Sequence, residues 1–134
     1  MTLKRIVLAH ASGAWDRFEP YYNVLSRWHQ MYTLTEKILH PQYGIDDPFT
    51  YIKERDAFII DSALLASDNQ NVAFAFQLIT NSVSSEKPTF VINRSGETWL
   101  LGSRLTIPSK HIYPMGTAPE LFLNSIGKKI RSYH

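Results

Sequence analysis

The sequence predicts an α/β fold built on a mainly parallel β-sheet. Short runs of branched apolar residues recur along the chain, and segments with apolar residues at helical spacing separate them. Continuous apolar runs are typical of strands that are buried on both faces of a parallel sheet. The alternation of strands and helices implies right-handed crossovers, which place helices on both faces of that sheet.

Two strands and one helix are expected in the N-terminal part of the chain. Residues 6–9 (IVLA) form the first strand, and residues 15–31 carry a helical pattern. Because proline is tolerated in the first turn of a helix, Pro20 predicts that the regular helix starts near Glu19. Residues 32–39 (YTLTEKIL) alternate weakly between apolar and polar residues and predict the second strand.

The middle of the chain repeats this arrangement. Residues 46–48 (DDP) predict a helix start, with an acid at the N-cap and a proline at the first helical position. Residues 57–60 (AFII) are the clearest strand of the chain. Residues 71–82 predict a strongly apolar helix, and residues 88–92 (PTFVI) predict the fourth strand.

The C-terminal part completes a sheet of five strands. Residues 110–115 (KHIYPM) predict the fifth strand, and a last helix is expected from Thr117 or Ala118. Residues 94–97 (RSGE) indicate a turn, and the pattern leaves open whether residues 98–101 pair back as an extra short strand. Five strands with such crossovers favour the order 2-1-3-4-5, which is that of three-layer flavodoxin-like or Rossmann-like sandwiches.

The composition is that of one ordinary globular domain, which we expect to span residues 1–134. The chain is 44% hydrophobic and 19% charged, with a formal net charge of +2, so a packed core is expected and disorder is not. We assign the basic residues near the C-terminus to the solvated face of a helix and do not expect nucleic-acid binding.

Several classes of protein and site find no support in the sequence. The absence of cysteine excludes disulfides and thiolate metal sites, and no HExxH or GxSxG motif is present. We therefore expect no metal, no cofactor and no serine nucleophile. The chain has no apolar run of roughly 20 residues and no signal-peptide pattern at its start, so we expect a cytoplasmic protein that does not enter a membrane.

Polar side chains are concentrated in the loops that follow the first, third and fourth predicted strands. In this fold, ligands bind beyond the carboxyl ends of the strands, near the switch between strands one and three. Two interpretations of His10 remain open, a structural histidine and a ligand group. At least one of the polar residues before the third helix is expected to be the N-cap of that helix. The candidate ligand-binding residues are His10, Ser12, Gly13, Ser67, Asn69, Asn71 and Asn93.

Two aspartates are the candidate catalytic residues. Asp61 closes a strand of four apolar residues, where a carboxylate loses solvation and must find a donor or a ligand. Asp68 follows in the polar loop before the third helix. We expect Asp61 to face the site.

The middle of the chain resembles nucleoside 2-deoxyribosyltransferase-like proteins. Residues 56–61 (DAFIID), the polar loop 67–71 (SDNQN), the helix 73–77 (AFAFQ) and residues 86–88 (EKP) follow in that order. They are similar to the family's D-A-V-V-A-D segment, its polar loop, its helix E-I/L-G-x-A and its G-K-P. The early IVLAHASG segment and the Leu-His-Pro at 39–41 also resemble the family's first loop and its Y/H-P.

The resemblance implies a nucleoside or nucleotide ligand and assembly into a homo-oligomer. It also implies a glutamate nucleophile at the start of the third helix, but that position falls here on Phe74 or Ala75. Neither side chain can act as a nucleophile. The family's chemistry would therefore require Asp68 or Asp61 as a substitute carboxylate.

Three functions are consistent with these residues. The first is a nucleoside- or nucleotide-binding protein with lost or altered catalysis, which acts as a sensor, regulator or inhibitor. The second is an active nucleoside or nucleotide N-glycosidase or deoxyribosyltransferase with Asp68 or Asp61 as the nucleophile. The third is a protein-interaction module without a small ligand.

Overall fold

A computed structural model describes residues 3–39, 48–66, 69–94 and 107–132. It shows a five-stranded sheet in the order β2-β1-β3-β4-β5, in which every pair of neighbours is parallel. The strands are β1 (Arg5–Ala9), β2 (Gln30–Leu34), β3 (Ala57–Asp61), β4 (Thr89–Asn93) and β5 (Ile112–Pro114). The predicted order is confirmed. The extra strand considered at 98–101 lies outside the described residues.

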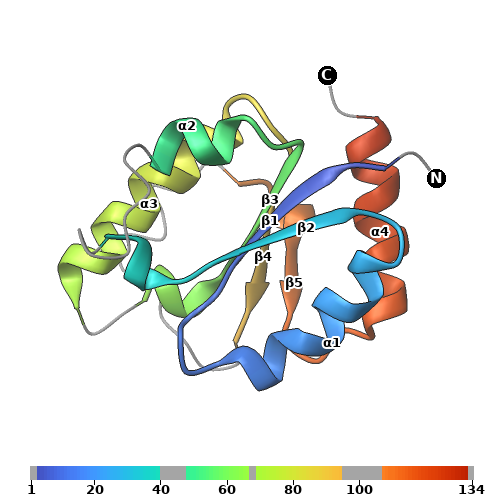
Figure 1. Cartoon of the computed structure of the whole chain (residues 1–134), viewed down its shortest axis with the longest axis horizontal. Helices are drawn as coiled ribbons and strands as arrows, with labels where there is room; N and C mark the ends of the chain where they lie inside the picture. Colours follow the sequence, from blue (N-terminus) through green and yellow to red (C-terminus); the bar gives the residue numbers. More distant parts are fainter. Residues whose placement is uncertain (1–2, 40–47, 67–68, 95–106, 133–134) are drawn as a thin grey trace.

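Helices cover both faces of the sheet (Figure 1). One face carries α1 (Trp15–Ser26) and α4 (Pro119–Arg131), and the other carries α2 (Pro48–Lys53) and α3 (Gln70–Ser84). No helix within the described ranges is long and apolar enough to span a membrane.

The core consists of two layers, one on each side of the sheet. Along β3, Ala57 and Ile59 pack with α1 and α4, whereas Phe58 and Ile60 pack with α2 and α3. This alternation follows from the two-residue period of a strand. Because β3 is buried on both faces, the residue that ends it, Asp61, is also placed inside the protein.

The second strand is shorter than its alternating pattern suggests. It ends at Leu34, and a 3-10 helix (Glu36–Leu39) follows where the sequence predicted more strand. Thr35 accounts for the turn, because its Oγ1 accepts a hydrogen bond from the Lys37 N–H at 3.2 Å. Its carbonyl also accepts the Ile38 N–H at 3.1 Å. Short polar side chains start turns by bonding to the backbone in this way.

The first helix begins earlier than expected. It starts at Trp15 and carries Pro20 inside it, whereas the sequence placed the regular helix from about Glu19. A proline leaves the carbonyl of the preceding turn without its usual donor. Pro20 lies on the exposed side of α1, where water can supply that donor, so the helix continues through it.

Candidate functional site

The Asp61 side chain is completely buried at the end of β3, and both of its oxygens accept hydrogen bonds. Arg94 donates to both oxygens, from Nε to Oδ1 at 3.0 Å and from Nη2 to Oδ2 at 2.7 Å. Two backbone amides complete the set, with Ala63 N–H on Oδ1 at 2.9 Å and Ala11 N–H on Oδ2 at 3.0 Å. The paired contacts from Arg94 are the fork geometry that favours arginine over lysine as the partner of a carboxylate.

This arrangement joins the three loops that the strand order brings together. Ala11 belongs to the loop after β1, Ala63 to the loop after β3, and Arg94 to the loop after β4. A further bond from the Arg94 N–H to Ser62 Oγ, at 2.9 Å, links the last two loops again. We name Asp61 and Arg94 with these contacts the loop clamp.

The loop clamp gives Asp61 a structural role. An ionised carboxylate has about four lone-pair positions, and four donors point at this one. Attack on a sugar would require it to leave Arg94 and two amides while still inside the core. The geometry therefore argues against the nucleophilic role considered for Asp61. The other candidate nucleophile, Asp68, lies outside the described residues, as does Ser67.

Ser12 is bound to a carboxylate that the sequence reasoning missed. The Ser12 N–H donates to Glu36 Oε2 at 2.9 Å, and the Ser12 hydroxyl donates to Glu36 Oε1. Glu36 begins the 3-10 helix directly after β2. The alternating pattern of residues 32–39 predicts continuous strand at this position and gives no sign that Glu36 meets the loop after β1. The signal that could have found it is an acid just after the second strand of a Rossmann-like sheet.

Glu36 is held as an anion. Burial alone would raise the pKa of this carboxyl, but the hydrogen bonds from Ser12 and from its own backbone, together with the nearby His10, bring the pKa below its ordinary value. The side chain is only half-buried, so its carboxylate is also within reach of solvent. It can accept further hydrogen bonds from a bound molecule.

His10 is packed among aromatic rings. Its Nδ1 lies 2.8 Å from the Ala11 carbonyl oxygen, and its ring lies 5.2 Å from that of Trp15 and 5.9 Å from that of Phe18. The side chain is almost fully buried. Of the two interpretations left open by the sequence, these contacts favour the structural one.

The remaining candidates lie around the same edge of the sheet. Gly13 is exposed, and a Cβ built on it would meet nothing within 4 Å. Asn69 is the N-cap of α3, since its Oδ1 accepts the Asn71 N–H at 3.0 Å, so the expected N-cap is confirmed. Asn71 is exposed in the first turn of α3, and Asn93 ends β4.

The position that the family resemblance aligns with a glutamate, Phe74 or Ala75, lies on α3. Phe74 is 45% exposed on α3, and Ala75 is half-buried. No carboxylate lies in α3 at all, because the helix reads QNVAFAFQLITNSVS.

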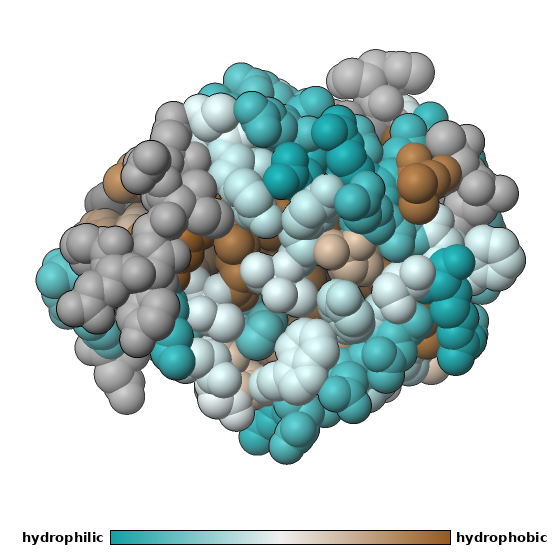
Figure 2. All heavy atoms as spheres, in the orientation of Figure 1, coloured by the Kyte–Doolittle hydropathy of each residue, from teal (hydrophilic) through white to brown (hydrophobic). Residues whose placement is uncertain are grey.

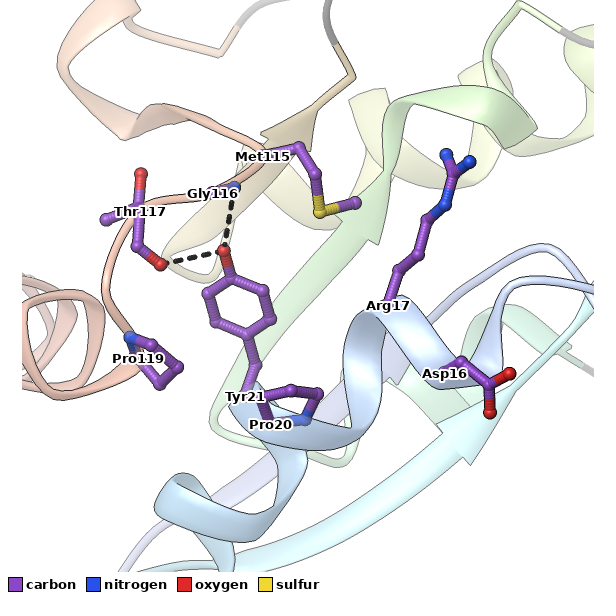
Figure 3. A pocket seen from close by; sticks show the side chains of 8 residues that line it. All are labelled: Asp16, Arg17, Pro20, Tyr21, Met115, Gly116, Thr117 and Pro119. Carbon is purple, nitrogen blue, oxygen red and sulfur yellow. Dashed lines mark hydrogen bonds between the residues drawn. The ribbon is translucent and has the colours of Figure 1, made fainter.

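A pocket of about 360 Å³ lies between α1 and the turn before α4, apart from these loops (Figure 3). Tyr21 reaches across it from α1, donating to the Thr117 carbonyl at 2.8 Å and accepting the Gly116 N–H at 3.2 Å. None of the predicted site residues lines it. The lining residues are Asp16, Arg17, Pro20, Tyr21, Met115, Gly116, Thr117 and Pro119.

In the described ranges, no three His, Asp or Glu side chains lie close enough together to hold a metal ion.

Comparison with known proteins shows the fold and no activity. No family model matches the sequence, and no curated protein matches it significantly. Among solved structures, the lysine decarboxylase LdcF of Francisella novicida superposes on 99% of this chain, with a TM-score of 0.54 and 19% identity. The chain covers 18% of that protein. At this identity the likeness supports a shared α/β fold alone.

Proposed function

We propose that this protein binds a nucleoside beside Glu36 and Ser12, at the carboxyl edge of the sheet, and does not catalyse a reaction there. The observation that supports this is the position of Glu36. In Rossmann-like sheets an acid at the end of the second strand accepts hydrogen bonds from ribose hydroxyls. Glu36 follows β2 directly, is ionised, and stands against the loop after β1.

The charges of this edge favour a neutral nucleoside over a nucleotide. A phosphate at the start of a Rossmann-like helix is held by backbone N–H groups of the loop after β1. Here the Ala11 N–H donates to Asp61 and the Ser12 N–H donates to Glu36. The protein's own carboxylates thus take two of the donors that could hold a phosphate, and Glu36 would repel it.

The absence of catalysis in this proposal follows from the clamp and from α3. Asp61 is bound to Arg94 and two amides, and Phe74 or Ala75 stands where the resembled family has its nucleophile. A sensor or regulator that recognises the nucleoside without cleaving it fits these two observations. The rival, an N-glycosidase or deoxyribosyltransferase, would depend on Asp68.

A second candidate function is a protein-interaction module without a small ligand. The exposed apolar side chains Phe74 and Leu78 on α3 favour it. Ligand binding separates the two candidates, because a pure interaction module gives no response to nucleosides.

The test uses calorimetry and thermal shift with ribonucleosides, their 2′-deoxy counterparts and their 5′-monophosphates, while chromatography follows release of free base. The ribonucleosides are expected to bind more tightly than the deoxynucleosides and the monophosphates. A charge-assisted hydrogen bond contributes about 1.5–3 kcal/mol, so Glu36→Gln should weaken binding roughly tenfold or more. Glu120→Gln, at an exposed position on α4, is the matched control and should bind normally.

Several results would contradict the proposal. Monophosphates that bind more tightly than nucleosides would show that the edge accepts phosphate after all. Release of free base, abolished by Asp68→Ala, would establish the enzymatic rival. No response to any nucleoside would favour the interaction module.

A further inference from the structure

The pocket between α1 and the turn before α4 has mainly apolar walls (Figure 3). Pro20 and Tyr21 contribute to it from α1, and Met115 and Pro119 contribute from either side of the turn. In the view of Figure 2 most of the surface is hydrophilic or neutral, including that along the lower edge, where α1 lies in Figure 1. Small-molecule sites have volumes of roughly 300–1,000 Å³. With about 360 Å³, this pocket has the size and the walls to bury a small apolar group.

The polar groups of the turn are already paired within the protein. The Tyr21 hydroxyl donates to the Thr117 carbonyl at 2.8 Å and accepts the Gly116 N–H at 3.2 Å. The Thr117 N–H and hydroxyl both donate to the Pro114 carbonyl, at 3.1 and 2.7 Å. These bonds fix one wall of the pocket before any ligand binds, which lowers the ordering cost of binding. They also leave few groups of the turn for hydrogen bonds to a ligand.

Arg17 supplies a positive charge at the pocket. Its side chain is exposed, and within the described ranges it forms no hydrogen bond or ion pair with another residue. Asp16 precedes it in the chain, but consecutive residues do not face each other on a helix. In Figure 3 the Asp16 carboxylate points away from the other lining side chains, whereas Arg17 extends beside Met115. The guanidinium is therefore available to a bound anion.

We propose that this pocket binds a small aromatic carboxylate, with its ring between the apolar side chains and its carboxylate on Arg17. The thioether of Met115 makes favourable contacts with an aromatic ring. A guanidinium presents paired donors that match a carboxylate. The site is separate from Glu36 and Ser12, so this proposal does not rest on nucleoside binding, and either can fail without the other.

The test is a titration of the isotope-labelled whole chain with naphthoate, followed by two-dimensional NMR. Chemical-shift changes should saturate and concentrate at the backbone amides of Tyr21, Gly116 and Thr117. The amides of Ser12 and Glu36, which report on the proposed nucleoside site, should change little. Naphthylmethanol has the same rings without the charge and should bind roughly fivefold more weakly or worse, because it lacks the charge-assisted hydrogen bond.

Three variants separate the charge from the shape of the pocket. Arg17→Gln should weaken naphthoate binding roughly fivefold or more and remove its advantage over naphthylmethanol. Arg131→Gln removes the same charge from an exposed position at the other end of α4, so it is the matched control and should bind normally. Pro20→Phe should fill the pocket and weaken both compounds. Because a proline inside a helix lacks the N–H donor, this change restores a helical hydrogen bond and should preserve the fold.

Four results would each overturn the proposal. They are an absence of shifts at the amides around the pocket, naphthylmethanol that binds as tightly as naphthoate, an equal loss in Arg131→Gln, and unchanged binding in Pro20→Phe. Circular dichroism confirms that each variant is folded.

Discussion

Removing Arg94 from the loop clamp is the most direct way to test the structural role of Asp61. In Arg94→Met the Asp61 carboxylate keeps the Ala11 and Ala63 amides but loses both guanidinium contacts, at 3.0 and 2.7 Å. Breaking a buried ion pair by removing one partner costs about 3–5 kcal/mol. Because the Arg94 side chain is 18% exposed, water can reach part of the vacated space. We therefore expect about 3 kcal/mol, the lower end of this range.

The measurement is urea unfolding, supported by thermal melts. A loss of about 3 kcal/mol should lower the melting temperature by roughly 10 °C for a domain of this size. The matched control is Arg27→Met, which removes an ion pair to Glu120 in which both side chains are about two-thirds exposed, at 64% and 65%. Exposed pairs contribute about 0–1 kcal/mol, so this variant should unfold almost like the original protein.

A double variant separates the clamp from general damage to the loop. Asp61→Asn removes the buried charge, so Arg94→Met should cost less in its presence than alone, with a coupling energy of roughly 1–3 kcal/mol. If Arg94→Met cost less than about 1 kcal/mol, or if the two changes simply added, the clamp would not be a coupled unit. Asp61 would then return as a candidate for chemistry.

Two further predictions concern a buried histidine and a tyrosine. Burial, and then the charge of Lys4, lower the pKa of His29 from 6.5, and its Nδ1 accepts the Lys4 N–H at 3.2 Å. As the pH falls through 6.5, the unfolded chain therefore binds more protons than the folded chain, and the free energy of unfolding should decrease. Urea titrations at a series of pH values should show this decrease, and show it less steeply in His29→Gln. A free energy of unfolding that does not change with pH would contradict the prediction. Tyr21→Phe leaves the Thr117 carbonyl and the Gly116 amide without their partner and should cost about 1–3 kcal/mol in the same assay, whereas Tyr22→Phe, a half-buried neighbour, serves as the control.

The strand order could be predicted because it depends on local patterns and general rules. The apolar runs at β1, β3 and β4 are unambiguous, and right-handed crossovers leave few alternatives for their arrangement. The length of β2 could not be predicted, since one side chain, that of Thr35, ends the strand by bonding to the backbone. The alternation of apolar and polar residues continues past Thr35 and gives no sign that the strand ends there.

The contacts of the candidate site were harder to foresee for a different reason. That a carboxylate at Asp61 must find a donor followed from the buried strand before it, but the donor, Arg94, lies 33 residues away. Likewise Ser12 and Glu36 are separated by 24 residues. Sequence patterns indicate that a polar group needs a partner, and only the folded chain decides whether that partner is a ligand or the protein itself.

Asp61 and Glu36 make different contacts at the carboxyl edge of the sheet, so their loss should have different effects. Asp61 links the loops after β1, β3 and β4, and a preformed site would reduce the ordering cost of the proposed binding. Within the part of the chain that the structure describes, Glu36 accepts hydrogen bonds from Ser12 and its own backbone, and its half-buried carboxylate keeps acceptor capacity toward solvent. Loss of Arg94 should therefore lower stability and ligand affinity together, through displaced loops. If a nucleoside binds here as proposed, loss of the Glu36 charge should lower its affinity while the melting temperature changes little, because Asp61 supports the loops and Glu36 would contact the ligand.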